Sequence, residues 1–331
     1  MTTIADVAAA ASVSPSTVSQ VMNGRDQFYS EETKRRVLAA IKDLGYVPSA
    51  VARALARSRT QTVGVVGERP DDLHCAPMLM AVHELARSYG YHVSLLPPHD
   101  DLDQQFADRR FDVVLIARDV SQADDISASI AGSHQIAVAA GSMTSTRPSS
   151  VLAACWCDEK GLLSLAEHLA ELGHRHVAFL GYRAAARRSS LFLTVAETLG
   201  ITAVPLPGPL EEDGPALGAA TAREALSLHP RPTALVGRTD AVALGAMHAV
   251  QEAGLRVPED ISIAGYYDFN YSAYLSPALT TVYTPFKECA VAVLTEALEA
   301  LESDPVQPPP PRLVEFPTQL QVRGSTGPPP A

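Results

Sequence analysis

The chain has 331 residues, enough for two or three domains, and 47% of them are hydrophobic, as in a globular protein with sizeable cores. No stretch reaches the roughly 18 uninterrupted apolar residues of a membrane span, and the N-terminus has no basic start followed by an apolar run. The four cysteines, Cys75, Cys155, Cys157 and Cys289, have neither zinc-finger spacing nor a CxxC pair, which favours buried thiols over a metal or cofactor site. These features exclude membrane-embedded and disulfide-rich secreted proteins and favour the cytoplasm.

The formal net charge of −11 is divided unevenly along the chain. Residues 1–60 hold eight lysines and arginines against five acidic residues, whereas the remainder holds 18 basic against 32 acidic residues. A basic segment attracts phosphate, and an acidic body discourages indiscriminate coating of DNA. The division therefore indicates that nucleic acid binds to the N-terminal segment.

Two short helices are predicted at the N-terminus. Residues 12–14, Ser-Val-Ser, interrupt the first helical pattern, and Ser14 can cap a second helix with Pro15 at its first position. Ser16 and Gln20, four residues apart, face away from the first helix together, which predicts an all-α helix-turn-helix. The apolar residues expected to pack the two helices together are Ile4, Val7, Ala8, Ala11, Val18, Val21 and Met22.

The outward face of the second helix has two interpretations. Ser16 and Gln20 could be ordinary solvated polar residues, or they could contact bases. Within a capped helix-turn-helix, base contact is the favoured interpretation, because glutamine can pair two ways with adenine and serine is permissive. Pro15 either caps the helix only or touches a thymine methyl group.

A third helix is predicted over residues 31–44. Ser30 can cap it, and Glu31 and Glu32 occupy its first turn, where the helix dipole favours negative charge. Gly45 follows its end, and Pro48-Ser49 opens a further short helix.

Beyond residue 60, short apolar runs alternate with helical stretches in two successive series. This alternation predicts parallel sheets covered by helices on both faces, and two series predict two similar α/β lobes. A ligand is then expected in the crevice at the carboxyl ends of the strands. The strand-like runs are TVGVV, YHVSLL, DVVLI and QIAVAA, followed by HVAFLG, TAVPL, TALVG and ISIAGY, with LVEF and QLQV as late strands.

The segments TIADVAAAASVSPSTVSQVMNG and GYVPSAVARALA closely resemble the head of the LacI/GalR family of bacterial repressors, nearly continuously from Thr3 to Ser58. The resemblance implies a hinge helix at residues 50–56 that folds only on operator DNA. Leu55 alone could be hinge packing, but it matches the family leucine that wedges into the minor groove and kinks the duplex. The residues expected to contact DNA are Pro15, Ser16, Thr17, Ser19, Gln20, Arg25, Ser30, Thr33, Tyr46, Arg53 and Leu55.

The segments AEHLAELGHRHVAFLG, RPTALVGRTDAVALGA and YLSPALTTVYTP look like the C-terminal lobe of the same regulators, which are similar to periplasmic sugar-binding proteins. The expected fold is therefore a helix-turn-helix head plus a two-lobed α/β periplasmic-binding-protein-like body. The implied boundaries are 1–48 for the DNA-binding domain, 49–60 for the hinge, 61–323 for the body and 324–331 for a disordered, proline-rich tail. Lobe 1 takes about 61–157 and 285–302, and lobe 2 takes about 158–284 and 312–323.

The resemblance also implies an effector site between the lobes. Arg188, four residues before Phe192, fits the family arginine that contacts the ligand, and Asp240 and Phe286 are further candidates. The family's Gly-aromatic-Asp-Asp turn has Tyr267 at its first aspartate, which binds sugar hydroxyls in many relatives. This change weakens hydroxyl pairing and offers ring stacking. A normal sugar site, a different ligand and no ligand all stay open.

Motifs for catalysis are absent from the sequence: it has no GxSxG elbow, HExxH, P-loop or GxGxxG. The expected function is a non-enzymatic transcriptional repressor that binds a palindromic operator as a homodimer and responds to a small, sugar-related molecule. The alternative is an effector-independent architectural or developmental DNA-binding regulator with a degenerate pocket.

Overall fold

The computed structural model describes residues 2–22, 28–46, 59–67, 75–96, 102–117, 120–130, 135–143, 146–183, 187–208, 214–303 and 306–330. The chain separates into two compact units, Met1–Gln61 and Thr62–Ala331, here called the head and the body. Within the described ranges, no helix is both long and apolar enough to cross a membrane.

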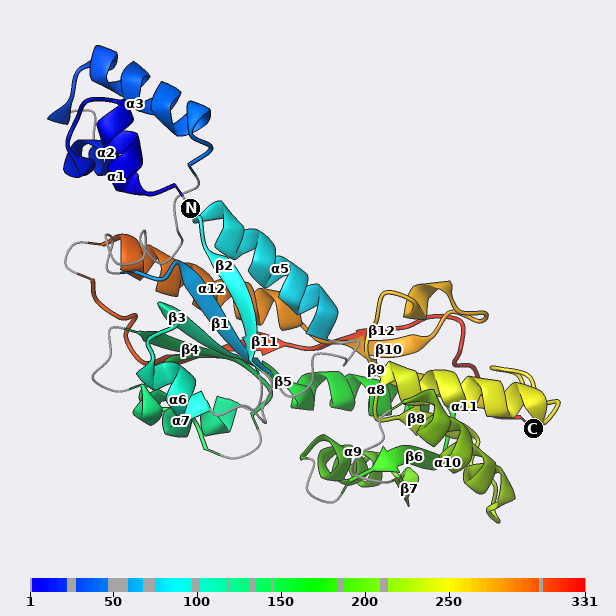
Figure 1. Cartoon of the computed structure of the whole chain (residues 1–331). Helices are drawn as coiled ribbons and strands as arrows, with labels where there is room; N and C mark the ends of the chain where they lie inside the picture. Colours follow the sequence, from blue (N-terminus) through cyan, green and yellow to red (C-terminus); the bar gives the residue numbers. More distant parts are fainter. Residues whose placement is uncertain are drawn as a thin grey trace. The chain divides into compact units, whose positions relative to one another are not determined.

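The head contains three short helices, α1 (Ile4–Ala10), α2 (Pro15–Met22) and α3 (Glu31–Asp43), coloured blue in Figure 1. Both predicted caps are confirmed, because Ser14 Oγ accepts the Thr17 amide at 3.1 Å and Ser30 Oγ accepts the Thr33 amide at 3.2 Å. Each cap satisfies a helical N–H that has no partner within its own helix. The small core that joins the three helices contains Val7, Ala8, Ala11, Val18, Val21, Val37 and Ala40.

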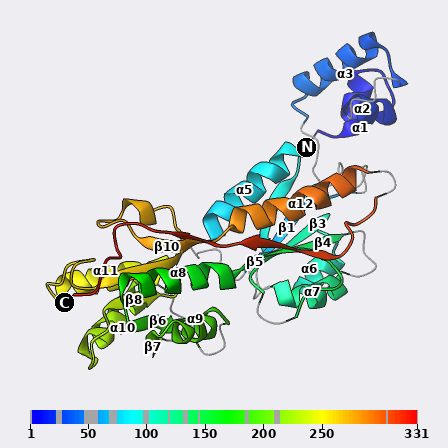
Figure 2. The same cartoon turned by 180° about the vertical axis from the view of Figure 1, so that it is seen from behind.

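The first lobe of the body is a six-stranded parallel sheet in the order β2-β1-β3-β4-β5-β11. Helices α5 and α12 lie side by side on one face, and α6 and α7 cover the other (Figures 1 and 2). The elements are β1 (Thr62–Gly67), α5 (Cys75–Ser88), β2 (His92–Leu96), α6 (Leu102–Ala107), β3 (Val113–Ala117), η2 (Val120–Gln122), α7 (Ala123–Ser129), β4 (Ile136–Gly141), β5 (Leu152–Cys157), α12 (Phe286–Glu302) and β11 (Arg312–Pro317).

The second lobe repeats this topology in the order β7-β6-β8-β9-β10-β12, and only the β10–β12 pair is antiparallel. Helices α10 and α11 pack on one face and α8 and α9 on the other. The two similar lobes predicted from the sequence are confirmed. The elements are α8 (Asp158–Leu172), β6 (His176–Tyr182), α9 (Arg187–Thr198), β7 (Thr202–Pro207), α10 (Pro215–Ser227), β8 (Ala234–Gly237), α11 (Asp240–Glu252), β9 (Ser262–Tyr267), η3 (Ser272–Tyr274), β10 (Thr280–Tyr283) and β12 (Gln319–Gln321).

The assignment of residues 312–323 to lobe 2 is wrong for the first of the two late strands. Strand β11 pairs in parallel with β5 of lobe 1, from Arg312 beside Leu152 to Pro317 beside Cys157. It therefore provides hydrogen-bond partners for the backbone groups on the outer edge of β5. The chain therefore crosses between the lobes three times, after β5, after β10 and after β11. Thr318 joins two of these crossings, because its hydroxyl donates to the Cys157 carbonyl at 2.7 Å and accepts the Gly161 amide at 3.0 Å.

The predicted disorder of residues 324–331 is also wrong over 324–330, which lie on the second lobe. Ser325 is completely buried, and its hydroxyl donates to the Ile263 carbonyl at 2.6 Å and accepts the Thr280 amide at 2.8 Å. The Gly327 carbonyl accepts from the buried His174 ring at 2.9 Å. Prolines lack amide donors, so few backbone donors of this segment need partners, and hydrogen bonds such as these hold it on the second lobe although its composition suggested a free tail.

Candidate functional site

Helix α2 presents one polar face to solvent. Pro15 and Ser16 are exposed and Gln20 is half-buried, whereas Val18 on the opposite face is completely buried. The Ser14 hydroxyl lies 2.6 Å from Ser16 Oγ and 2.9 Å from the Thr17 hydroxyl, so a chain of hydroxyl groups marks the start of the helix. The fold thus brings together the residues that the sequence predicted as base readers.

Other predicted DNA contacts have structural partners within the head. Ser30 Oγ lies 3.0 Å from the Thr33 hydroxyl in addition to capping α3, and Tyr46 packs against the head core. Ser19 and Thr33 are half-buried. Arg25, Arg53, Leu55 and all of the predicted hinge (49–60) except residues 59 and 60 lie outside the described residues.

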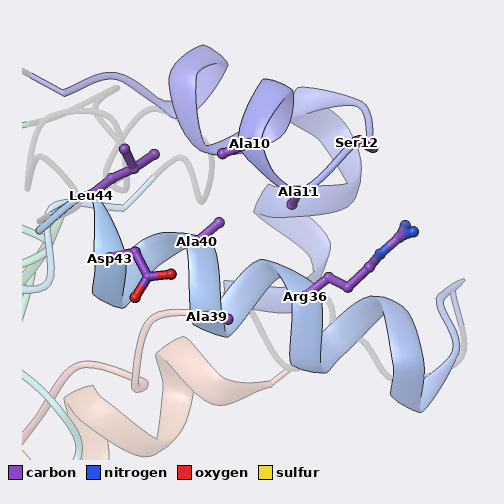
Figure 3. A pocket seen from close by; sticks show the side chains of 8 residues that line it. All are labelled: Ala10, Ala11, Ser12, Arg36, Ala39, Ala40, Asp43 and Leu44. Carbon is purple, nitrogen blue, oxygen red and sulfur yellow. The ribbon is translucent and has the colours of Figure 1, made fainter.

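A shallow groove of about 340 Å³ runs between the end of α1 and the C-terminal half of α3 (Figure 3). Its lining is mostly small and apolar, and none of the predicted base readers belongs to it. Because a ligand site needs convergent polar groups, this groove does not define one. The lining residues are Ala10, Ala11, Ser12, Arg36, Ala39, Ala40, Asp43 and Leu44.

In the body, Arg188 of α9 lies at the centre of a second polar cluster. Its Nε is 3.3 Å from Asp158 Oδ2, and the two side chains are only 9% and 15% exposed. The guanidinium carbon lies 3.9 Å from the ring centre of Tyr266 and 4.6 Å from that of Tyr267, both within cation–π range. Burial lowers the pKa of Arg188, but the Asp158 charge and the Tyr267 side chain outweigh it and raise that pKa above its ordinary value.

Asp158 is a functional candidate that the sequence interpretation missed. Its Oδ1 accepts the Tyr266 hydroxyl at 2.5 Å, so both carboxylate oxygens are engaged by other side chains. Burial and the Asp158 charge together raise the pKa of Tyr266 well above its ordinary value, which keeps this hydroxyl a donor. The available signal was its position directly after β5, at the strand edge where ligands are expected.

An aromatic run connects this cluster to the first lobe. The Tyr267 ring lies 5.0 Å from that of Phe286 in α12, and Phe286 meets Trp156 edge-on at 4.6 Å. Tyr267 also stacks on Phe269 at 5.7 Å. Its φ of +110° is rare for a residue with a side chain, and such strain is concentrated at functional sites. The structure therefore brings together Arg188, Tyr267 and Phe286, as predicted.

Asp240, which the sequence interpretation also named as an effector contact, lies outside this cluster. It is completely buried, and its oxygens accept the hydroxyls of Thr281 at 2.5 Å and Ser272 at 2.6 Å and the Phe269 amide at 2.7 Å. The side chain fixes the loop after β9 against β10. Since these three bonds use both of its oxygens inside the protein, Asp240 has a structural role.

Comparisons with known proteins cover both units. Residues 3–49 match the bacterial regulatory proteins of the lacI family, and residues 166–326 match the periplasmic binding protein-like domain. The chain is 33% identical to the HTH-type transcriptional repressor PurR of Yersinia enterocolitica over 323 residues, covering 92% of this chain and 93% of that protein. PurR of Yersinia pestis strain Pestoides F is also 33% identical, over 328 residues, with the same coverage.

Solved structures of similar fold include the Lac repressor dimer bound to operator and the anti-inducer ONPF, with a TM-score of 0.80 at 24% identity. The Lac repressor bound to ONPG in the repressed state also gives 0.80, at 25% identity. Both alignments cover 98% of this chain and 99% of the other. The relatives named here are transcriptional repressors rather than enzymes.

Proposed function

Since the chain belongs to the LacI/GalR family of bacterial regulatory proteins, we propose that its head reads operator bases with the exposed face of α2 while its body controls that contact. The chain is a DNA-binding transcriptional repressor of this family. The observation that carries the assignment of the reading face is the pairing of exposed Ser16 with buried Val18 on one capped helix. Gln20 supplies the bidentate group and the hydroxyl-rich start of α2 supports it.

The protein acts as a homodimer on a palindromic operator, because one head covers only a half-site. Two apolar side chains on neighbouring elements of lobe 1 suit the subunit contact: Met80 of α5 is 59% exposed and Leu95 of the edge strand β2 is 46% exposed. Residues 49–60 form the hinge, in which Leu55 wedges into the central base step. The site of action is the cytoplasm, where bacterial DNA lies.

The effector site lies at Arg188, Tyr267 and Phe286 between the lobes. Ligand binding there would change how the lobes close and so weaken or strengthen the operator complex. Recognition of a neutral sugar through an aspartate is disfavoured, because Tyr267 holds that position and packs on Phe286. An effector-independent regulator is the second candidate function, and the Arg188–Asp158 ion pair favours it because the arginine already has a partner.

Selection of bound sequences from random DNA tests this proposal. We expect the full chain to enrich a palindrome, and sedimentation to give a dimer at micromolar concentration. Leu55→Ala should keep the same palindrome but reduce both its affinity and the bend angle in gel shifts. A stable monomer that binds a non-palindromic site would refute the proposed arrangement.

A further inference from the structure

We infer that Asp158 is an internal ligand of Arg188, and that the site between the lobes is built for an anion, a carboxylate or a phosphate, that takes the place of the Asp158 carboxylate. The inference deepens the proposed function by naming the chemical class of the effector, and it rests on that function only for the coupling to DNA.

The geometry around Arg188 selects the kind of ligand. The ring centres of Tyr266 and Tyr267 lie 3.9 Å and 4.6 Å from the guanidinium carbon, and the two rings meet edge-on, so they cover adjacent sides of the guanidinium and leave its remaining N–H donors to a polar ligand. The planar fork of N–H donors on an arginine matches the paired oxygens of a carboxylate or phosphate. Asp158 now supplies such an oxygen to Nε at 3.3 Å.

Charge balance excludes a neutral replacement for Asp158. Arg188 is 9% exposed and stays protonated, so losing its partner would leave a buried, uncompensated charge. A neutral sugar brings hydroxyl groups but no charge, and Tyr267 offers no carboxylate to bind them. An anionic ligand restores the ion pair that it breaks, so it can take the place of the Asp158 carboxylate, whose advantage is that it is already held beside Arg188.

The position of Asp158 connects this exchange to the lobes. It is the first residue of α8, immediately after the chain leaves β5 of lobe 1. The next residue, Glu159, pairs with Arg187, which also donates to the Met143 carbonyl of lobe 1 at 3.4 Å. Displacing the Asp158 carboxylate would thus disturb a crossing between the lobes, beside contacts that already join them.

Trp156 provides the measurement, because it is the single tryptophan of the chain and touches Phe286 within the aromatic run. The full-length protein and Asp158→Asn are titrated with glucose, gluconate and glucose 6-phosphate, which share a carbon skeleton but differ in charge. Asparagine still accepts the Tyr266 hydroxyl but no longer neutralises Arg188. We expect Asp158→Asn to bind at least one of the two anions about fivefold or more tightly than the parent, and glucose to bind neither protein.

The two anions distinguish a carboxylate site from a phosphate site. Arg188→Ala in the Asp158→Asn background should abolish the gain, and Asp260→Asn, which removes an acidic group bonded to Arg256 elsewhere in the same lobe, should give none. If Asp158→Asn is poorly folded, Tyr266→Phe removes the hydroxyl that shares the Asp158 carboxylate with Arg188, so the ion pair should tighten and anion affinity should fall below that of the parent. Equal binding of glucose and the anions, or no gain for either anion, would overturn the inference. Operator binding by the parent is measured separately in a gel shift, so failure of the anion site is distinct from failure of the DNA-binding function.

Discussion

The head and the site between the lobes use polar side chains in opposite ways. On α2 of the head, Ser16 is exposed and the apolar side of the helix is turned inward. In the body, Arg188 is 9% exposed and Asp240 is completely buried, and each is held by neighbouring side chains. The polar face of α2 is therefore available to a partner, whereas Arg188 and Asp240 first serve the protein itself. Substitutions on α2 should consequently change operator affinity, whereas substitutions of buried polar residues in the body should change the free energy of unfolding.

The largest expected effect comes from Asp240→Ala in the body. The change leaves the hydroxyls of Thr281 and Ser272 and the Phe269 amide without their buried acceptor. We expect the free energy of unfolding of the body to fall by about 3–5 kcal/mol, measured by urea denaturation. Arg223→Ala, which breaks an exposed ion pair with Glu252, is the control and should cost less than about 1 kcal/mol. Equal losses in the two variants would remove the distinction between buried and displayed polar groups.

Gln20→Ala should weaken DNA binding while leaving the stability of the head almost unchanged. Operator affinity should fall by about 1–3 kcal/mol with relaxed preference at one base pair per half-site, because a bidentate base contact is lost. Thermal unfolding of the head should hardly change, since Gln20 lies outside the head core. Asp43→Asn, on the exposed end of α3, serves as the control in fluorescence anisotropy. An unchanged base preference for Gln20→Ala would show that this residue does not read DNA.

The pH dependence of stability tests whether Asp124, a polar group of the body, stabilises the folded protein. Burial raises its pKa, but hydrogen bonds from Ser150 and Ser149 outweigh this and lower the pKa from 3.8 to about 2. A carboxyl with a depressed folded pKa stabilises the protein above its unfolded pKa, and this stability is lost as the pH falls from 3.8 through about 2. We expect a contribution of up to about 2 kcal/mol at neutral pH. Asp124→Asn should flatten the stability profile below pH 3.8, and an unchanged slope would contradict the assignment.

The smallest effect is expected for Ser30→Ala. This residue caps α3 and is also a predicted DNA contact, so the variant separates a loss of stability from a loss of DNA affinity. Loss of the cap on α3 should lower head stability by about 1 kcal/mol, seen as a lower melting temperature. Operator affinity should fall no further than this loss of folding explains. A much larger fall in affinity would show that Ser30 also contacts phosphate, as the family resemblance implies.

The sequence was sufficient to predict the three described helices of the head, because capping and helical spacing are local properties of the chain. Capping by Ser14 and Ser30 and the helical spacing of Val18 and Val21 all depend on residues within a few positions of one another. The alternation of strands and helices in the body could also be predicted from the sequence, since each strand is a short apolar run. Arg188, Tyr267 and Phe286 were found by resemblance and do lie together.

What the sequence did not reveal depends on distant partners. Asp158 and Arg188 are thirty residues apart, and nothing local indicates that one neutralises the other. Asp240 looked like a ligand contact because it follows a strand, but its acceptors are used by residues 29 to 41 positions later. Strand β11 was assigned to the wrong lobe because its pattern does not say which sheet edge it completes. The tail was misjudged because its proline content gave no sign of the two hydrogen bonds that the buried Ser325 hydroxyl makes with the second lobe.

The three crossings between the lobes have a consequence for synthesis on the ribosome. Most of the second lobe is one continuous stretch, from α8 to β10, whereas the first lobe lacks α12 and β11 until the chain is almost complete. Helix α12 contributes Phe286, Val293 and Leu298 to the first-lobe core, so the nascent first lobe exposes that core while the second is being made. Because domains fold as units during translation, the lobe that is synthesised first should mature last. Until α12 is synthesised, the apolar face of the first lobe is the part of the nascent chain most prone to aggregate and to bind chaperones.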